Sequence, residues 1–343
     1  MKAAILEKYA SDSRELIVRD IPIPSVADDE VLVKVMAAAV NPLDNMIVRG
    51  EVKLIVAYQV PLVMGNELSG IVEKVGNGVK DFQKGDRVYA RMPLDKIGAF
   101  AEYAAVRASA LAKIPDYLSF EEAASVPLTA LTAWQAYELM QVEKGKTIFI
   151  SGGTGSVGAM AIPIAKSLGL TVITNGSAEN EERVLKLGAD RFIDYRRENY
   201  ADILTDVDYV LDTLGDKELE NEFRILKDGG SLVSLRGMPN GDFAKRMGLP
   251  LFKRLAFGIV GKRYDKLAAK RNQKYHFIFV HEDGEGLKKI SAIFAEKQVQ
   301  TSVDGVFSLD DVNKAMKKVA SGRSRGKTII KVYWQDKNMG GSA

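Results

Sequence analysis

Three glycines spaced as G-x-G-x-x-G stand in the stretch SGGTGSVG, at Gly153, Gly155 and Gly158. The apolar run TIFI precedes them and AMAIPIAKSLG follows, so the motif joins a predicted strand to a predicted helix. In that setting the first glycine permits a tight turn, the second lets the backbone approach a pyrophosphate, and the third allows close helix packing. The helix N-terminus supplies free N–H groups for phosphate. We therefore expect a dinucleotide to bind along Gly153, Thr154, Gly155, Ser156, Val157 and Gly158.

The end of the next predicted strand indicates which dinucleotide binds. An NAD site places Asp or Glu there to bond the ribose 2′-hydroxyl, but TVIT is followed by NGSA, and the first acid is Glu179. Ser177 can donate to a 2′-phosphate, and further partners are Arg183, Tyr195 and Arg196. We predict NADPH as the cofactor. The alternative is that the two arginines are ordinary solvated surface charges.

The chain offers few ligands for a transition metal. It contains no cysteine and two histidines, His276 and His281, both in HFIFVH. If that run is a strand, the odd separation of the histidines points them to opposite faces. Since a catalytic zinc needs three protein ligands, we expect no zinc site.

The composition is that of a globular protein with more than one domain. Its 343 residues exceed the length of a typical domain, and no apolar run is long enough for a membrane span. The N-terminus lacks a signal-peptide core, so we expect a cytoplasmic protein. A net charge of +3 does not indicate a nucleic-acid partner.

The predicted elements divide the chain into an α/β protein of two parts. Residues 1–110 show short apolar or alternating runs separated by Pro, Gly, Asp and Asn, which is typical of a β-rich domain. Residues 119–140 predict two helices, with Ser119 as N-cap and a break at Pro127. From Thr147 strands alternate with helices, including a helix over 221–230, which indicates a doubly wound parallel sheet. The tail after residue 282 is too poor in strands to form a domain alone.

A set of further motifs occurs in a fixed order along the chain. They are AAAVNPLDNMIVRG (37–50), PLVMGNELSGIVEKVGNGV (61–79), FQKGDRVYA (82–90), GAFAEY (98–103), AASVPLTALTAWQAY (123–137), LGADRFIDY (187–195), VDYVLDTLG (207–215) and SRGKTIIKV (324–332). With these motifs the chain resembles the medium-chain dehydrogenase/reductase superfamily, in particular its zinc-independent quinone oxidoreductase branch. The resemblance implies a GroES-like catalytic domain over 1–122, a Rossmann domain over 123–282, and a segment 283–343 that returns to the first domain.

The resemblance also indicates which residues correspond to zinc ligands, and the chain departs from the family pattern at two further positions. The zinc ligands of metal-dependent relatives correspond to Asn41, Asn66 and a position near Thr129, none of which is a usual zinc ligand. Related NADPH enzymes have a lysine where this chain has Glu179 or Asn180. Some quinone reductases have a tyrosine where this chain has Met46.

Without zinc, the family resemblance implies hydride transfer from NADPH to a quinone or an α,β-unsaturated carbonyl compound, whose conjugation spreads the developing charge. Asn41 is the first candidate to face the nicotinamide or the acceptor, with Thr129 or Thr132 donating nearby. Solvent, Tyr58 or Asp44 could supply the proton, and of these we favour solvent. Asp44 is expected mainly to accept backbone N–H groups in its turn.

Some alternatives stay open at this stage. The basic segment 243–275 holds ten Lys or Arg and one acid. It is interpreted as a solvated helix beside an edge strand that pairs across a homodimer in this family; a lid or a surface for anionic lipid or nucleic acid are the alternatives. The function alternatives are an enoyl thioester reductase and a non-enzymatic NADPH-binding protein.

Overall fold

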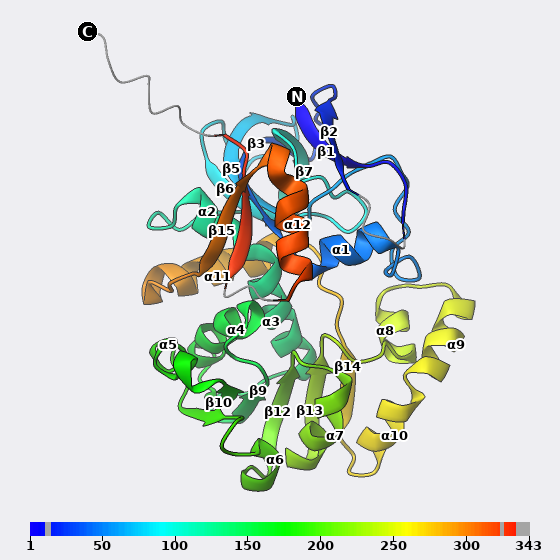
Figure 1. The fold of residues 1–343 in the computed structure, drawn as a ribbon, viewed down its shortest axis with the longest axis vertical. Coiled ribbons are helices and arrows are strands. Elements are labelled where there is room, and N and C mark those ends of the chain that lie inside the picture. The colour runs from blue at the N-terminus through cyan, green and yellow to red at the C-terminus, as the bar shows by residue number, and fades with distance from the viewer. Residues whose placement is uncertain (11–14, 323–325, 334–343) are drawn as a thin grey trace. The chain divides into compact units, whose positions relative to one another are not determined.

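The computed structural model describes residues 1–10, 15–322 and 326–333 (Figure 1). These residues form two compact units. The first contains Met1–Leu128, His281–Ala295 and the described residues from Gln300 on, and the second contains Thr129–Val280 and Glu296–Val299. The chain thus comes back to the first unit after building the second.

Two sheets form the first unit, and a strand from the tail is built into the larger one. The small antiparallel sheet has the order β2-β1-β4, formed by Ile17–Asp20, Lys2–Leu6 and Leu62–Val63. The seven-stranded sheet has the order β15-β16-β3-β5-β6-β8, with β7 also paired to β3. Its strands are β15 (Val303–Ser308), β16 (Lys327–Lys331), β3 (Glu30–Val40), β5 (Glu67–Val75), β6 (Arg87–Arg91), β8 (Leu111–Lys113) and β7 (Tyr103–Arg107). Because β16 lies between β15 and β3, the tail completes this sheet.

Helices of the first unit begin and end at residues that the sequence marks clearly. In α1 (Pro42–Arg49), proline holds the first helical position, Asn41 is the N-cap, and Gly50 ends the helix with a φ of 72°. Ser119 accepts from the Glu122 N–H at the start of α2 (Phe120–Ala124), as predicted. The remaining helices are α11 (Gly284–Lys297) and α12 (Val312–Ala320). Helix α2 packs on β3 and β5, and the first unit includes the residues up to Leu128.

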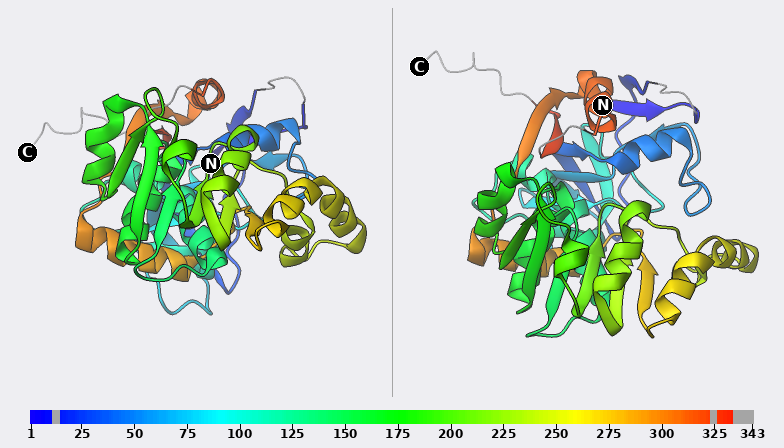
Figure 2. Two further views of the ribbon diagram at one scale, coloured as in Figure 1. Left: turned by 90° about the horizontal axis from the view of Figure 1, so that it is seen from below. Right: turned by 60° about the horizontal axis from the view of Figure 1, so that its bottom comes forward.

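The second unit is the predicted doubly wound parallel sheet (Figure 2). Its strand order is β11-β10-β9-β12-β13-β14, formed by Arg191–Asp194, Thr171–Gly176, Thr147–Ile150, Val207–Asp212, Leu226–Ser234 and Lys274–Phe277. The connecting helices are α3 (Pro127–Met140), α4 (Ser156–Ser167), α5 (Glu181–Lys186), α6 (Tyr200–Ile203), α7 (Asp216–Ile225), α8 (Gly241–Arg246), α9 (Leu251–Val260) and α10 (Lys262–Ala269). Numbered within the unit, the order is 3-2-1-4-5-6, the Rossmann arrangement. A GroES-like sheet unit and a Rossmann unit therefore make up this α/β chain.

Two local expectations were wrong. The helix expected over 221–230 ends at Ile225, because Leu226 adopts an extended conformation and begins β13. The run HFIFVH is also not one strand, since β14 ends at Phe277. His276 belongs to the second unit and His281 to the first, so the face argument does not apply to this pair.

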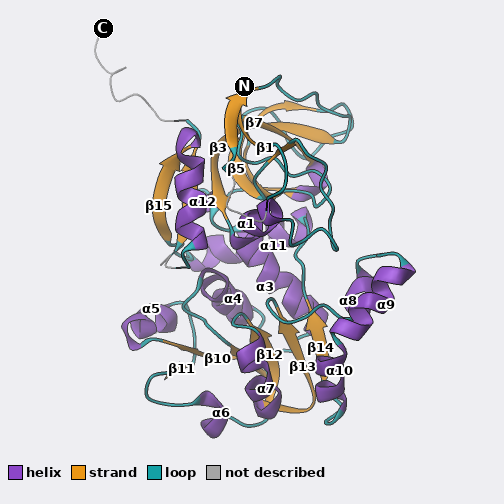
Figure 3. Cartoon of the chain, turned by 45° about the vertical axis from the view of Figure 1, so that its right-hand side comes forward, coloured by secondary structure: helices purple, strands orange, loops and turns teal. Residues whose placement is uncertain are grey.

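Helices α8, α9 and α10 gather beyond strand β14, at one edge of the parallel sheet (Figure 3). The basic segment thus forms helices, as interpreted from the sequence. None of the helices in the described ranges is both long and apolar enough to cross a membrane.

Candidate active site and cofactor-binding loop

The glycine loop connects β9 to α4 at the carboxyl edge of the parallel sheet, which is where open α/β sheets bind ligands. A Cβ on Gly158 would lie 2.4 Å from the Gly153 Cα, so helix and turn pack more closely than any side chain permits. A Cβ on Gly155 would meet only the Gly152 carbonyl oxygen, at 3.4 Å. The space over Gly155 fits the expected approach of a pyrophosphate. No side chain caps α4 at Gly155, which leaves its first N–H groups available.

The left-handed residue of this turn is Gly152 rather than Gly153. Its φ is 68°, and a Cβ there would lie 2.7 Å from the Thr213 Oγ1. Gly153 instead packs against Thr174, whose Oγ1 would be 2.0 Å from a Cβ. Sequence reasoning assigned the turn to the first glycine of the motif and missed the glycine before it.

Two side chains outside the motif hold the loop in place. Asn175, at the end of β10, accepts from the Gly152 N–H at 2.8 Å. Arg183 of α5 donates from Nη2 to the Thr154 carbonyl oxygen at 2.6 Å. Arg183 was predicted as a phosphate partner, whereas its observed bond ties the glycine loop to the next helix.

The other predicted phosphate partners lie together at the ends of two neighbouring strands. Ser177 follows β10 and Tyr195 follows β11, and the strands pair in parallel with Gly176 opposite Asp194. Tyr195 is 57% exposed, and the Arg196 guanidinium lies 5.6 Å from its ring centroid. Arg196 also reaches the Glu179 carboxylate at 3.5 Å on an exposed surface. Such a pair is weak, so a phosphate can compete for the arginine.

In the first unit, Asn41 joins a buried network rather than presenting a free amide. Its Nδ2 donates to the Glu67 Oε1 at 2.8 Å and to the Ala39 carbonyl oxygen at 3.2 Å. Its Oδ1 accepts from the Lys327 Nζ at 2.5 Å. Asn41 is only 3% exposed, and both ends of its amide are engaged within the first unit.

Asp44 is fully buried beside this network. Its Oδ2 accepts from the Asn41 N–H and its Oδ1 from the Asn66 Nδ2, each at 2.7 Å. The first bond closes the capping box of α1, so Asp44 does accept a backbone N–H in its turn. Burial raises the pKa of the Asp44 carboxyl to about 7, partly offset by these two hydrogen bonds.

Lys327 and Glu67 are two members of the network that sequence reasoning missed. They form an ion pair with side chains 7% and 0% exposed, and the Glu67 Oε2 accepts from the Leu128 N–H at 2.7 Å. Both residues stand in motifs quoted above, GNE and GKTII, but nothing local in the sequence indicates that they meet. Pairing of β16 with β3 brings them together.

The positions that correspond to zinc ligands carry the wrong donors for zinc. Asn41 has both ends of its amide hydrogen bonded, Asn66 offers an amide whose Nδ2 donates to Asp44, and the Lys327 ammonium lies against both Asn41 and Glu67. A cation placed there would meet this fixed positive charge. Across the residues the structure describes, no three His, Cys, Asp or Glu side chains cluster as metal ligands would.

The remaining predicted site residues fall in both units. Tyr58 belongs to the first, is 8% exposed, and has its backbone carbonyl held by the Tyr9 hydroxyl at 2.6 Å. Thr129 and Thr132 lie one helical turn apart on the part of α3 that belongs to the second unit, and both are buried.

Two family models match the chain. The alcohol dehydrogenase GroES-like domain matches residues 27–116, and the zinc-binding dehydrogenase family matches residues 187–330.

Curated relatives and solved structures agree with these matches. A 2-methylene-furan-3-one reductase of Solanum lycopersicum is 33% identical over 340 residues, which are 96% of this chain and 79% of that protein. A chloroplastic NADPH-dependent alkenal/one oxidoreductase of Arabidopsis thaliana is 34% identical over 266 residues, 72% of this chain and 68% of that one. The structure of a quinone oxidoreductase from Coxiella burnetii superposes with a TM-score of 0.80 at 28% identity, covering 97% of this chain and 99% of the other.

Proposed function

The chain belongs to the quinone oxidoreductase-like branch of the medium-chain dehydrogenase/reductase superfamily, and on that premise we propose that it reduces quinones or α,β-unsaturated carbonyl compounds with NADPH and without zinc. As a member of this branch it is an oxidoreductase that uses a nicotinamide cofactor. The acceptor class, the preference for NADPH and the independence from zinc are the proposal.

One observation carries the metal-free part of the proposal. At the zinc-ligand position of Asn41, both ends of the amide are engaged by the buried pair of Glu67 and Lys327. Without a Lewis acid, an alcohol oxygen is hard to activate at neutral pH. A conjugated acceptor is suited to such a site, because its own π system takes up the charge that hydride addition creates.

The cofactor part of the proposal rests on the end of β10. The side chains of the second unit bind and orient NADPH: the glycine loop takes the pyrophosphate, and Ser177 and Tyr195 flank the expected 2′-phosphate. The cofactor supplies the hydride. Neither of the first two residues after β10, Ser177 and Ala178, is a carboxylate that would repel that phosphate.

The test is a matched panel of acceptors. NADPH and NADH oxidation is followed with a benzoquinone, an alkenal, an enone and an enoyl-CoA, using enzyme treated with a zinc chelator. We expect turnover of the quinone or the enone, kcat/KM at least about tenfold higher with NADPH, and no loss after chelation. Turnover of the enoyl-CoA alone would establish the thioester reductase instead. Tight NADPH binding without turnover of any acceptor would establish a non-enzymatic binding protein.

A further inference from the structure

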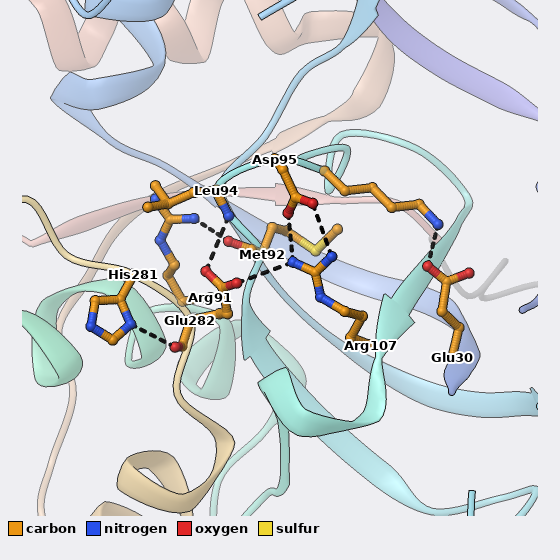
Figure 4. A network of polar contacts seen from close by, with 9 residues as sticks. Glu30, Arg91, Met92, Leu94, Asp95, Arg107, His281 and Glu282 are labelled. Carbon is orange, nitrogen blue, oxygen red and sulfur yellow. Dashed lines mark hydrogen bonds and ion pairs between the residues drawn. The ribbon is translucent and has the colours of Figure 1, made fainter. Parts of the chain in front are cut away.

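Arg91, the last residue of β6, is a fully buried cation with open hydrogen-bond donors. It stands opposite Glu67 in the pairing of β5 with β6. Its Nη1 donates to the Met92 carbonyl oxygen, whereas Nε and Nη2 have no partner in the described part of the chain (Figure 4). Unsatisfied buried donors on a charged group are costly to a fold. An arginine kept in this state points to a ligand that completes it.

The acidic residues around Arg91 form hydrogen bonds with other groups. Glu282 accepts from the Arg107 Nη2 and from the Leu94 N–H, each at 3.1 Å. Asp44 is held by the two asparagines, and Glu67 pairs with Lys327. These carboxylates stabilise the Arg91 charge from a distance, against the burial that lowers its pKa, but none of them hydrogen bonds to it.

The open edge of Arg91 has a defined chemical preference. Nε and Nη2 present two parallel N–H groups, the side-on fork that binds both oxygens of a carboxylate or converges on one oxyanion. The same edge is used elsewhere in this chain, where the Arg49 Nε and Nη2 hold the Oε1 and Oε2 of Glu51. Arg91 therefore presents, without a partner among the described residues, the same pair of donors that Arg49 uses.

Tyr58 contributes a second open donor in the same unit. Its hydroxyl is buried and has no hydrogen-bond partner among the described residues. Burial raises the pKa of the hydroxyl to about 12, and the Arg91 charge opposes that rise. A tyrosine with this pKa stays protonated at neutral pH and can donate.

We propose that Arg91 binds an oxygen of the acceptor that is, or becomes, anionic. The inference rests on the proposed function. Two sources share this chemistry: a carboxylate already on the acceptor, or the oxygen charged by the reaction. In the second case hydride from NADPH bonds to the β-carbon, the π electrons move to the carbonyl oxygen, and the guanidinium stabilises the enolate until solvent protonates the α-carbon. NADP⁺ and the saturated carbonyl compound are the products.

The experiment compares benzoylacrylate with its methyl ester in wild-type enzyme, Arg91→Met and Arg91→Lys. If the fork binds a carboxylate, Arg91→Met raises KM for the acid by about 10- to 100-fold and leaves the ester within about twofold. If it holds the enolate, kcat falls by a similar factor for acid and ester, with both KM values nearly unchanged. Arg91→Lys keeps the charge but loses the fork and recovers little. Kinetics of Arg91→Met within about threefold of wild type on both compounds would overturn the proposal.

Thermal unfolding separates this role from a structural one. Because the buried donors are unsatisfied, Arg91→Met should melt at the wild-type temperature or above it. A clear fall in melting temperature would show that Arg91 supports the fold and would count against the proposal. Lys84→Met, which removes an exposed lysine of the same unit, is the control and should change neither kinetics nor melting.

A binding measurement tests Arg91 separately from the proposed function. If wild-type enzyme turns over no acceptor, the proposed function is wrong, and calorimetric binding of the non-reducible benzoylpropionate decides on Arg91. Benzoylpropionate binding by the wild type that is lost in Arg91→Met would support the oxyanion site. Equal binding by the two proteins, or no binding by either, would contradict it.

A different observation, on the surface of the second unit, carries a second proposal. Four large apolar side chains of α9 are exposed: Leu251 by 70%, Phe252 by 68%, Leu255 by 63% and Ile259 by 76%. At 3.6 residues per turn they lie within about 100° of the helix circumference, on the side away from the buried Phe257. The helix therefore turns its apolar face to solvent, the reverse of a helix that only flanks a sheet.

Charge indicates what covers this face. Exposed Lys262 and Lys266 follow on α10, within a segment that holds ten basic residues and one acid. Two copies of such a face would repel each other, whereas an anionic lipid surface complements both the apolar stripe and its basic flank. We infer that α9 lies in the interface of an anionic membrane.

Vesicle sedimentation tests this inference. The full chain should bind vesicles of phosphatidylcholine with phosphatidylserine, and bind less to phosphatidylcholine alone and at high salt. Phe252→Glu with Ile259→Glu should abolish binding, while the exposed Leu185→Glu of α5 should not. Absence of vesicle binding, or a dimer that the double variant dissociates, would overturn the inference.

Discussion

The Lys327 Nζ donates to the Asn41 Oδ1 at 2.5 Å, although 286 positions separate the two residues in the chain. The same ammonium pairs with Glu67, so one residue of the returning tail neutralises a carboxylate buried in the N-terminal sheet. The tail is thereby part of the candidate site and not only a cover for the sheet.

Replacing Lys327 by Met should destabilise the first unit strongly. The change leaves the fully buried Glu67 carboxylate without its cation, which costs about 3–5 kcal/mol. Urea unfolding measures the loss. The matched control is Lys331→Met on the same strand, whose half-buried pair with Glu121 should contribute less than about 1 kcal/mol. Equal losses of stability from the two substitutions would show that the buried ion pair contributes no more than the half-buried one.

Asp44 should make stability depend on pH in a direction opposite to most carboxylates. Its folded pKa of about 7 lies above the unfolded value, so the folded state binds the extra proton. Its contribution is complete below about pH 4 and is lost as the pH rises through 7, by on the order of 2–4 kcal/mol. Asp44→Asn removes this dependence.

The Asp44 measurement is a double comparison. Unfolding free energies of wild type and Asp44→Asn are determined at pH 5 and pH 8, and the wild-type advantage should shrink at pH 8. An advantage that grows with pH would mean that Asp44 remains ionised when buried.

Cofactor affinities should distinguish Arg183, which holds the glycine loop, from Ser177 and Tyr195, which are proposed to contact the 2′-phosphate. Ser177→Ala and Tyr195→Phe are expected to weaken NADPH about tenfold and NADH less than about twofold, since each removes a donor to the 2′-phosphate. Arg183→Ala should weaken both cofactors, because Arg183 holds the Thr154 carbonyl oxygen. Fluorescence titration gives the dissociation constants, with Lys186→Ala of the same helix as control. Equal losses of both cofactors in Ser177→Ala would contradict the NADPH assignment.

Asn175→Ala should loosen the glycine loop without changing cofactor preference. The substitution strands the Gly152 N–H, at a cost of about 1–3 kcal/mol. We expect similar increases in the dissociation constants of NADPH and NADH and a lower melting temperature. Asn175→Asp, which keeps the acceptor oxygen, should retain most of the stability. A selective loss of NADPH would instead place Asn175 at the phosphate.

Local signals explain what could be predicted from the sequence. The glycine spacing, the strand before it and the helix after it are neighbours in the chain, so the Rossmann unit and its loop were predictable. The boundary of β13 depended on the extended conformation of Leu226, which composition does not reveal. Arg91 sits in the run RVYAR, where alternation does not predict a buried guanidinium, and Lys327 meets Asn41 only through a strand pairing across the whole chain.

The position of β16 between β15 and β3 also determines when the larger sheet can be completed during synthesis of the chain. Residues Ala37–Val40 of β3 pair with Thr328–Lys331, and Ala37 and Ala38 also pair with β5 on the other side. The ribosome makes Thr328–Lys331 nearly 300 residues after β3, when the continuous stretch 129–280 of the Rossmann unit has already emerged. Until then an apolar alanine-rich strand edge stays open, the kind of edge that recruits other chains. The larger sheet of the first unit is therefore completed only after the continuous part of the Rossmann unit has been translated.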